Sequence, residues 1–330
     1  MVRFSGWDRR RLAMIMAVSF AVSFAVTAAC GPHDAAPDDN PFAGAEFFVD
    51  PGSSAAKAAA ALRTQNPHDA AELDKIAHHS QADWFGDWVP ASQLTQTVAA
   101  RRRTIHAAGA LPVFVVYDIP LRDCHGYSGG GASSPSTYRT WIRNFAAGLG
   151  SGPAAVIVEP DALAQIDCLT PAQRTTRLGL LRYAVRALTA RPGTAVYLDA
   201  GHAGWVPAAS MAKRLRDAGV SNARGFSLNV SNYDATSAER AYGRQISSRI
   251  DGLPFVIDTS RNGLGSNGEW CNARDRALGT PPTGSTGDKN VDAFLWIKPP
   301  GQSDGTCNGG PAAGQWWTSY AIGLAQRASW

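Results

Sequence analysis

The sequence predicts an α/β protein in which parallel strands form a barrel-like sheet, and two observations lead to this prediction. Seven short apolar runs rich in β-branched and aromatic residues are spaced along the chain, as expected for parallel strands buried on both faces. Each run leads into an acid, an amide or a lysine. In α/β barrels the carboxyl ends of the strands share one rim, and that rim carries the chemistry. Polar groups delivered to one rim by seven strands are difficult to explain by packing alone, so an enzyme is expected.

Apolar runs and helical segments alternate along the chain, which favours one βα-repeating domain over two domains. The predicted strands, each with the polar residues it reaches, are Phe47–Val49 (Asp50), Val113–Ile119 (Asp118, Arg122, Asp123), Ala155–Val158 (Glu159, Asp161), Ala195–Leu198 (Asp199), Phe226–Leu228 (Asn229), Phe255–Ile257 (Asp258) and Ala293–Ile297 (Lys298). The predicted helices are Ser53–Asn66, Leu94–Ala108, Pro171–Arg191, Ala208–Ala218 and Ala238–Ile250. The first helix is rich in alanine and ends before Pro67, because proline cannot continue a helix.

Two long stretches, Gly126–Ser136 and Asn262–Asn290, carry no secondary-structure signal and are rich in glycine. Loops of this length inside a compact domain tend to be functional. Both leave from the predicted catalytic rim, so we expect them to cover the substrate.

Residues 1–30 have the composition of a targeting segment. Arg3 and Arg9–Arg11 precede an apolar stretch, Leu12–Ala29, which is the layout of a secretory signal peptide. The stretch is long enough to span a bilayer, so an uncleaved membrane anchor is the alternative, and Cys30 is a candidate for lipid attachment. The composition of residues 31–45 predicts a flexible linker. Residues 46–330 then form the predicted catalytic domain. We expect a secreted protein, with anchoring through the N-terminus as the alternative.

The charge balance excludes some partners. The chain has 31 basic and 27 acidic residues, a net charge of +4. A basic stripe that could follow a phosphate backbone does not occur outside the N-terminus, so nucleic acid is not an expected partner.

Four cysteines follow Cys30, namely Cys124, Cys168, Cys271 and Cys307. An even number in an exported chain favours disulfides, and four cysteines allow three pairings. The local pairing, Cys124 with Cys168 and Cys271 with Cys307, would tie neighbouring rim loops together. Zinc ligation is the alternative, but the spacings typical of zinc sites are missing from the sequence, so no metal and no cofactor are expected.

Four aspartates lie at or just after predicted strand ends, namely Asp123, Asp161, Asp199 and Asp304. Crowded carboxylates raise the pKa of at least one of them, because like charges in a desolvated cleft disfavour ionisation. A protonated acid beside ionised partners is what glycoside hydrolysis requires.

Tryptophans accompany these acids. Of the ten in the chain, several fall in predicted rim loops: Trp84, Trp88, Trp205, Trp270, Trp316 and Trp317. Sugar rings stack on indole faces, so aromatic residues with few charges favour a neutral polysaccharide as the substrate.

Seven motifs in the same order resemble glycoside hydrolase family 6. They are Val116–Cys124, Val158–Leu163, Tyr197–Trp205, Phe226–Tyr233, Asp258–Gly263, Glu269–Asn272 and Trp296–Gly301. The match runs from about Phe47 to the C-terminus. The resemblance implies a distorted, TIM-like (β/α) barrel with seven parallel strands. It also implies a secreted endo-β-1,4-glucanase (a cellulase) that inverts the anomeric configuration, with disulfides in the local pairing.

The resemblance also suggests roles for individual residues. By motif position, Asp161 looks like the general acid, Asp123 like the aspartate that tunes its pKa, and Asp304 like the residue usually proposed as base. Tyr117 resembles the tyrosine beneath the distorted sugar, and Ser128 the serine that orients the water. The candidate substrate-binding residues are Asp199, His202, Trp205, Asn229, Arg261, Trp270, Lys298 and the rim tryptophan Trp84.

Several alternatives remain open at this stage. Long insertions that could roof a cleft are not seen beyond the two glycine-rich stretches, which favours cleavage inside the glucan over a cellobiohydrolase. Two further alternatives are a carbohydrate-binding protein without turnover and a metal-dependent hydrolase using His202 with Asp199 and Asp161. The expected partner is a β-1,4-glucan, either cellulose, cello-oligosaccharides or mixed-linkage glucan, bound by a monomer.

Overall fold

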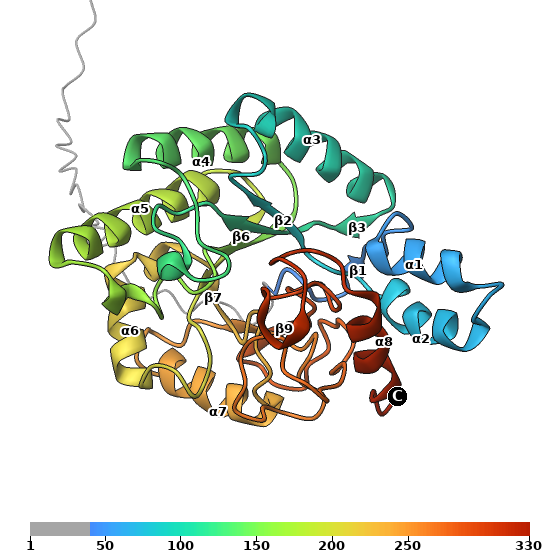
Figure 1. Cartoon of the computed structure of the whole chain (residues 1–330). Helices are drawn as coiled ribbons and strands as arrows, with labels where there is room; N and C mark the ends of the chain where they lie inside the picture. The colour runs from blue at the N-terminus through green and yellow to red at the C-terminus, as the bar shows by residue number, and fades with distance from the viewer. Residues whose placement is uncertain (1–39) are drawn as a thin grey trace, which may run out of the picture. The chain divides into compact units, whose positions relative to one another are not determined.

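A computed structural model describes residues 40–330, and the predicted leader lies outside the described residues. Seven parallel strands form one sheet in the order β2-β4-β5-β6-β7-β8-β9 (Figure 1). Their bounds are β2 Asp83–Gly86, β4 Val113–Tyr117, β5 Ala154–Val158, β6 Thr194–Asp199, β7 Gly225–Leu228, β8 Phe255–Asp258 and β9 Val291–Leu295. The predicted fold class, α/β with seven parallel strands, is confirmed.

The sheet curls until its two edge strands approach each other. The Ala82 N–H, directly before β2, donates to the carbonyl of Trp296 at 3.0 Å. The indole Nε1 of Trp84 donates to the carbonyl of Ile297 at 2.8 Å. These bonds join β2 to the residues that follow β9, although no strand ladder links the two edges within residues 40–330. The result is a distorted, incompletely closed barrel.

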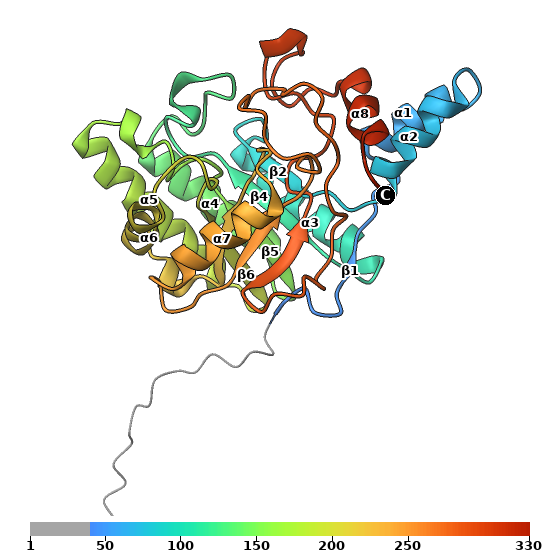
Figure 2. The ribbon, with the colours of Figure 1, turned by 90° about the horizontal axis from the view of Figure 1, so that it is seen from below.

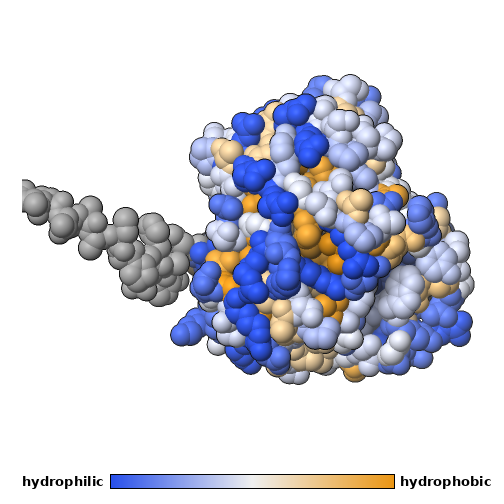
Figure 3. All heavy atoms as spheres, turned by 90° about the vertical axis from the view of Figure 1, so that its left-hand side faces the viewer, coloured by the Kyte–Doolittle hydropathy of each residue, from blue (hydrophilic) through white to orange (hydrophobic). Residues whose placement is uncertain are grey.

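Helices surround the outside of this sheet (Figures 1 and 2). Their bounds are α1 Ser54–Leu62, α2 Pro67–Ala77, α3 Ala91–Ala107, α4 Pro135–Leu149, α5 Pro171–Thr189, α6 Ala208–Asp217, α7 Thr236–Ser247 and α8 Thr318–Gln326. Both views place α1, α2 and α8 together at one side, where their apolar residues share a small core. The face that carries α5 and α6 is largely hydrophilic, with apolar atoms in narrow strips (Figure 3).

The strands are apolar on both faces because both faces are covered. In β4, Phe114 and Val116 pack in the core cluster that includes residues of the outer helices. Val113 and Val115, which alternate with them, pack with residues of the other strands in a second cluster. Burying each such side chain contributes about 1.5–3 kcal/mol. This two-sided burial explains why the strands appear in the sequence as continuous apolar runs.

One predicted strand was assigned to the wrong sheet. The segment Phe47–Val49 supplies only β1 (Glu46–Phe47), which pairs with β3 (Ala110–Leu111) in a separate two-stranded sheet. The seventh strand of the large sheet is β2, whose sequence Asp-Trp-Phe-Gly has no apolar run. It is an edge strand with a single neighbour, so two of its residues remain half-buried and need not be apolar.

The helices α2, α4 and α8 were not predicted, and Pro67 begins α2 as well as following α1. Proline is favoured at the first position of a helix, where its missing N–H is not needed. The first predicted helix thus ends earlier than expected, at Leu62, and Pro67 starts the next helix rather than ending the first.

The folded domain begins earlier than predicted. Phe42, inside the predicted linker, is 1% exposed and stacks on Phe47 with ring centroids 6.1 Å apart. The Asn40 amide donates to the carbonyl of Asp292 at 2.8 Å. Residues 40–45 are therefore part of the domain. From residue 40 onward, no helix is both long and apolar enough to cross a membrane.

Candidate active site

A cleft of about 1540 Å³ lies over the carboxyl ends of the strands. The predicted site residues that line it are Trp84, Tyr117, Asp123, Ser128, Asp161, His202, Trp205, Trp270, Lys298 and Asp304. Residues from loops after five different strands thus meet in one place, as the strand-end pattern predicted.

The loops that carry the first two acids turn sharply. Asp123, after β4, has φ 54°, and Asp161, after β5, has φ 69°. Leu121 and Glu159 also lie in the left-handed region, at 59° and 53°. Such conformations are strained for residues other than glycine and concentrate at functional sites.

Asp161 is surrounded by other carboxylates. Its backbone N–H donates to Asp199 Oδ1 at 2.9 Å. Desolvation raises the pKa of Asp161 well above its ordinary value, and the charges of Asp199, Asp123 and Asp304 raise it further. Lys298 opposes this rise without cancelling it. These influences favour the protonated form of Asp161, which is the form that the predicted role of general acid needs.

Asp123 is held by two donors. Its Oδ2 accepts the backbone N–H of Ser128 at 2.8 Å, and its Oδ1 accepts Nε2 of Gln165 at 2.9 Å. The Cys124–Cys168 disulfide links the same two loops, with Cα atoms 6.3 Å apart. The loop after β4 is thereby tied to the loop after β5.

The second disulfide joins Cys271 to Cys307, with Cα atoms 6.2 Å apart. The predicted local pairing of the four cysteines is confirmed.

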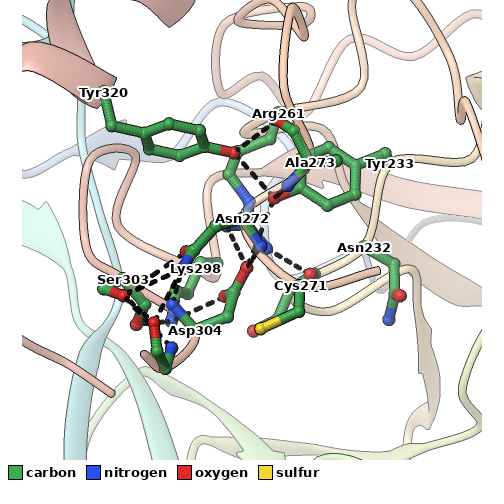
Figure 4. A network of polar contacts seen from close by, with 12 residues as sticks. Asn232, Tyr233, Arg261, Cys271, Asn272, Ala273, Lys298, Ser303, Asp304 and Tyr320 are labelled. Carbon is green, nitrogen blue, oxygen red and sulfur yellow. Dashed lines mark hydrogen bonds and ion pairs between the residues drawn. The ribbon is translucent and has the colours of Figure 1, made fainter. Parts of the chain in front are cut away.

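Asp304 lies in a dense polar network (Figure 4). Its Oδ2 accepts bonds from Arg261 Nη1 at 2.9 Å and from the backbone N–H of Asn272 at 2.9 Å. Tyr233 donates to the same oxygen at 3.3 Å, and Lys298 Nζ lies 3.2 Å from Oδ1. Burial alone would raise the pKa of Asp304, but Arg261 and Lys298 outweigh it and hold the pKa below its ordinary value. Asp304 is therefore a fixed anion whose two oxygens already have partners.

Three predicted substrate contacts lie behind the cleft wall. Arg261 is 0% exposed beneath Asp304, with its guanidinium 4.4 Å from the ring centroid of Tyr233. The amide of Asn229 is buried and bonds the backbone of Asp234 on both its oxygen and its nitrogen. Asp199 is also buried. In the described structure these residues support the cleft rather than line it.

The stacking surfaces are more exposed. Trp205 and Trp270 are 37% and 58% exposed along the cleft. Trp84 meets Tyr117 edge-on, with centroids 5.2 Å apart. Exposed aromatic faces in a groove suit the C–H faces of sugar rings.

The cleft lining also includes residues that sequence reasoning did not single out, among them Tyr127 and Gln165. Tyr127 lies 6.1 Å from Trp270, centroid to centroid, and an aromatic residue beside Ser128 in a glycine-rich rim loop was a usable signal. The signal for Gln165 was its position four residues after Asp161. Residues four apart are brought together by one helical turn, and here the Gln165 N–H donates to the carbonyl of Asp161.

One group of three potential metal ligands occurs in the described part of the chain, namely His202, Asp234 and Glu239, with ligand atoms within 4.8 Å of one another. It contains neither Asp161 nor Asp199, so it differs from the metal site considered from the sequence. Burial raises the pKa of Glu239 to about 8, whereas a metal requires deprotonated carboxylates. His202 Nδ1 lies 2.6 Å from Asp234 Oδ2. A histidine oriented by an aspartate explains this group better than a metal site does.

Treatment with EDTA is accordingly expected to leave the activity unchanged, because the predicted general acid, Asp161, does not belong to this group. Release of reducing ends would be measured before and after dialysis against the chelator, with a buffer-dialysed sample as control. A rate that falls and returns when zinc is added would contradict the expectation.

The buried acids predict how stability depends on pH. Burial raises the pKa of Asp118 and Glu239 to about 8, and that of Glu159 and Asp199 to about 7. Between about pH 4, where unfolded carboxyls titrate, and these values, the folded state binds more protons than the unfolded state. Stability therefore falls as pH rises through this window and levels off above about pH 8. We expect a lower Tm at pH 8.5 than at pH 5.

Glu239→Gln is the matched variant for this expectation. Its amide oxygen can still accept the Ala203 N–H, which Glu239 Oε1 accepts at 2.9 Å. In this variant the difference in Tm between pH 5 and pH 8.5 should be smaller than in the wild type, because its Tm at pH 8.5 should be higher. An equal Tm at both pH values in the wild type would show that these acids do not titrate as described.

Comparisons with known proteins agree with this geometry. The sequence matches the profile of glycosyl hydrolases family 6 over residues 42–328. It is 48% identical over 285 residues to endoglucanase A of Cellulomonas fimi, covering 86% of this chain but only 62% of that relative. It is 43% identical over 324 residues to endoglucanase 1 of Streptomyces halstedii, covering 94% of this chain and 97% of the relative.

Solved structures give the same result. Endoglucanase Cel6 from Mycobacterium tuberculosis, in complex with methyl-cellobiosyl-4-deoxy-4-thio-β-D-cellobioside, superposes with a TM-score of 0.83 at 51% identity, covering 87% of this chain and 98% of that chain. The catalytic core of cellobiohydrolase Cel6A from Chaetomium thermophilum reaches a TM-score of 0.74 at 27% identity, covering 88% of this chain and 99% of that chain. Of these relatives, the endoglucanases share more of the sequence.

Proposed function

The chain belongs to glycoside hydrolase family 6, and from this premise we propose that it is an endoglucanase that hydrolyses internal β-1,4-glucosidic bonds with inversion. The feature that carries the proposal is a pair of aspartates in one cleft whose pKa values are shifted in opposite directions. Desolvation and neighbouring carboxylates raise the pKa of Asp161. Arg261 and Lys298 lower the pKa of Asp304. Glycoside hydrolysis requires both a proton donor and negative charge near the reacting sugar.

Asp161 supplies the proton. As the bond between the anomeric carbon and the bridging oxygen breaks, Asp161 donates its proton to that oxygen, and the leaving chain departs as a neutral alcohol. The acid is then an anion among Asp199, Asp123 and Asp304, whose charges favour the return of a proton from solvent.

The water is expected to attack from the opposite face of the sugar. Asp304 is poorly suited to take its proton, because a low pKa means weak proton affinity and its oxygens already accept four donors. We assign it the electrostatic role of stabilising the positive charge that develops on the ring. Asp123 and Ser128 both line the cleft, so we assign proton removal from the water to Asp123, with Ser128 orienting the water.

The substrate class follows from the cleft lining and the relatives. Exposed tryptophans along a cleft of about 1540 Å³ suit several sugar rings of a neutral glucan. The Mycobacterium tuberculosis relative holds a thio-linked cello-oligosaccharide. We propose cello-oligosaccharides and cellulose as substrates, with mixed-linkage glucan also accepted.

Two measurements test the proposal. Carboxymethyl-cellulose viscosity should fall early relative to the release of reducing ends, as internal cleavage requires. Proton NMR of fresh cellopentaose digests should show the α-anomer first. Slow viscosity loss with cellobiose as sole product would indicate a cellobiohydrolase, and binding without reducing ends would indicate a binding protein.

We further propose that the protein is exported and acts as a monomer. The leader-like composition of residues 1–30 and the two disulfides support export, because disulfides persist in oxidising compartments. N-terminal analysis of protein from the culture medium would separate a cleaved leader from an anchored one.

A further inference from the structure

Two buried ionisable side chains outside the cleft bind the backbone of the loops that carry Asp123 and Asp161. We name these the β4 loop (residues 118–131) and the β5 loop (residues 159–170). Glu159, at the start of the β5 loop, is 0% exposed. Its Oε2 accepts the backbone N–H groups of Asp118 and Ile119, both at 3.0 Å. A carboxylate of one loop thus holds the first residues of the other.

Arg177 makes the complementary contacts from helix α5. Its Nη2 donates to the carbonyls of Pro120 and Leu121, both at 2.8 Å. Its Nη1 donates to the carbonyl of Ala162 at 3.3 Å. Arg177 is 2% exposed, and neither it nor Glu159 lines the cleft. A single guanidinium therefore bridges both loops, at carbonyls two and three residues before Asp123 and one residue after Asp161.

The bridged segments need such support. Leu121 and Asp123 in the β4 loop, and Glu159 and Asp161 in the β5 loop, all have positive φ. Backbone in this region persists only where the surrounding structure holds it. The planar fork of arginine can bond several carbonyls at once in a fixed geometry, which the single ammonium of lysine cannot match.

We propose that Arg177, together with Glu159, is a positioning residue that fixes the β4 loop against the β5 loop and so places Asp123 beside Asp161. The inference rests on the proposed function, because it concerns the acid of that reaction. Four charged groups act on Asp161: Asp199 from β6, Asp123 from the β4 loop, and Asp304 and Lys298 from beyond β9. Arg177 holds the loop of only one of them, Asp123. Loosening that loop moves the negative charge of Asp123 away from Asp161. The pKa of Asp161 then falls, and Asp161 loses its proton at a lower pH.

The test compares Arg177→Met and Arg177→Lys with the wild type on cellotetraose across pH 4 to 9. We expect kcat to fall by about 10- to 100-fold, the range that a displacement near 1 Å produces, while KM changes by less than about threefold. The alkaline limb of the kcat profile should move to lower pH. The loss should be smaller on 2,4-dinitrophenyl cellobioside, because its leaving group needs no proton.

Arg214→Met is the matched control. Arg214, on α6, donates to the carbonyls of Leu163 and Ala164 at 2.8 and 3.1 Å, so it binds the β5 loop without touching the β4 loop. This control should lower Tm but leave kcat and the alkaline limb in place.

Several results would overturn the proposal. One is a lowered Tm of the Arg177 variants, as in the control, with the wild-type kcat and pH profile unchanged. Another is Arg177→Lys with wild-type rates, since charge without the fork would then suffice. If Arg177→Met does not fold, Arg177→Lys decides the question by the same readouts. A wild type without activity on cellotetraose would instead refute the proposed function itself.

Discussion

Asp161→Asn is expected to lower kcat on cellotetraose by about 10²- to 10⁴-fold, the contribution of a positioned general acid. The amide has nearly the same shape as the protonated carboxyl but no proton that it can transfer. Binding should survive, because the tryptophans and Lys298 of the cleft are unchanged. Kinetics on cellotetraose and calorimetric titration with a non-hydrolysable thio-oligosaccharide would measure the two effects separately.

The leaving group provides the control for this variant. Activity on 2,4-dinitrophenyl cellobioside should fall far less, because dinitrophenolate departs without protonation. Asp217→Asn, at an exposed ion pair with Lys213 on α6, should match the wild type on both substrates. Equal losses on the two substrates, or lost binding, would show that Asp161 has a structural role.

Arg261→Met is expected to lower the free energy of unfolding by about 3–5 kcal/mol, the range seen when one partner of a buried ion pair is removed. Arg261 is completely buried and lies 2.9 Å from Asp304. Its loss leaves Asp304 with Lys298 as the only cation described beside it. Chemical denaturation followed by tryptophan fluorescence would measure the change.

The same variant should also change the pH profile. Arg261 helps to hold the pKa of Asp304 below its ordinary value, so its removal raises that pKa. Asp304 then takes up a proton at a higher pH, and the acidic limb of the kcat profile should move upward. If the acidic limb of the kcat profile does not move, the charge of Asp304 does not control activity at acidic pH.

Arg224→Met separates the two effects. Arg224 forms a bidentate pair with the buried Asp292 at the first residues of β9, away from the carboxyl ends of the strands. This variant should lose stability but keep the acidic limb. If Arg224→Met shifts the acidic limb of the kcat profile as Arg261→Met does, the shift results from lower overall stability and not from the charge of Asp304.

Much of the fold could be predicted because two-sided burial leaves a strong pattern. Six of the seven predicted strands belong to the large sheet, and each is a run such as Val113–Tyr117 with apolar residues on both faces. The edge strand Asp83–Gly86 could not be found this way, because one neighbour and half-buried residues impose no such pattern.

The site divides along similar lines. Asp123 and Asp161 line the cleft and the cysteines pair locally, as motif position predicted, because all of these residues lie in loops that follow strands. It did not reveal that Asn229 and Arg261 lie behind the cleft wall, because only neighbouring segments decide which side chains reach solvent.

The sequence by itself determined that seven buried parallel strands would bring several aspartates to one rim. Only the tertiary structure decided that the pKa of Asp161 is raised while that of Asp304 is lowered. The two side chains are chemically identical, so the difference lies in their partners. Asp161 has carboxylates around it, whereas Asp304 has Arg261, 43 residues away in the chain, and Lys298. Proton affinity depends on the distance to charges and on exclusion of water, and both are set by contacts between segments remote in sequence.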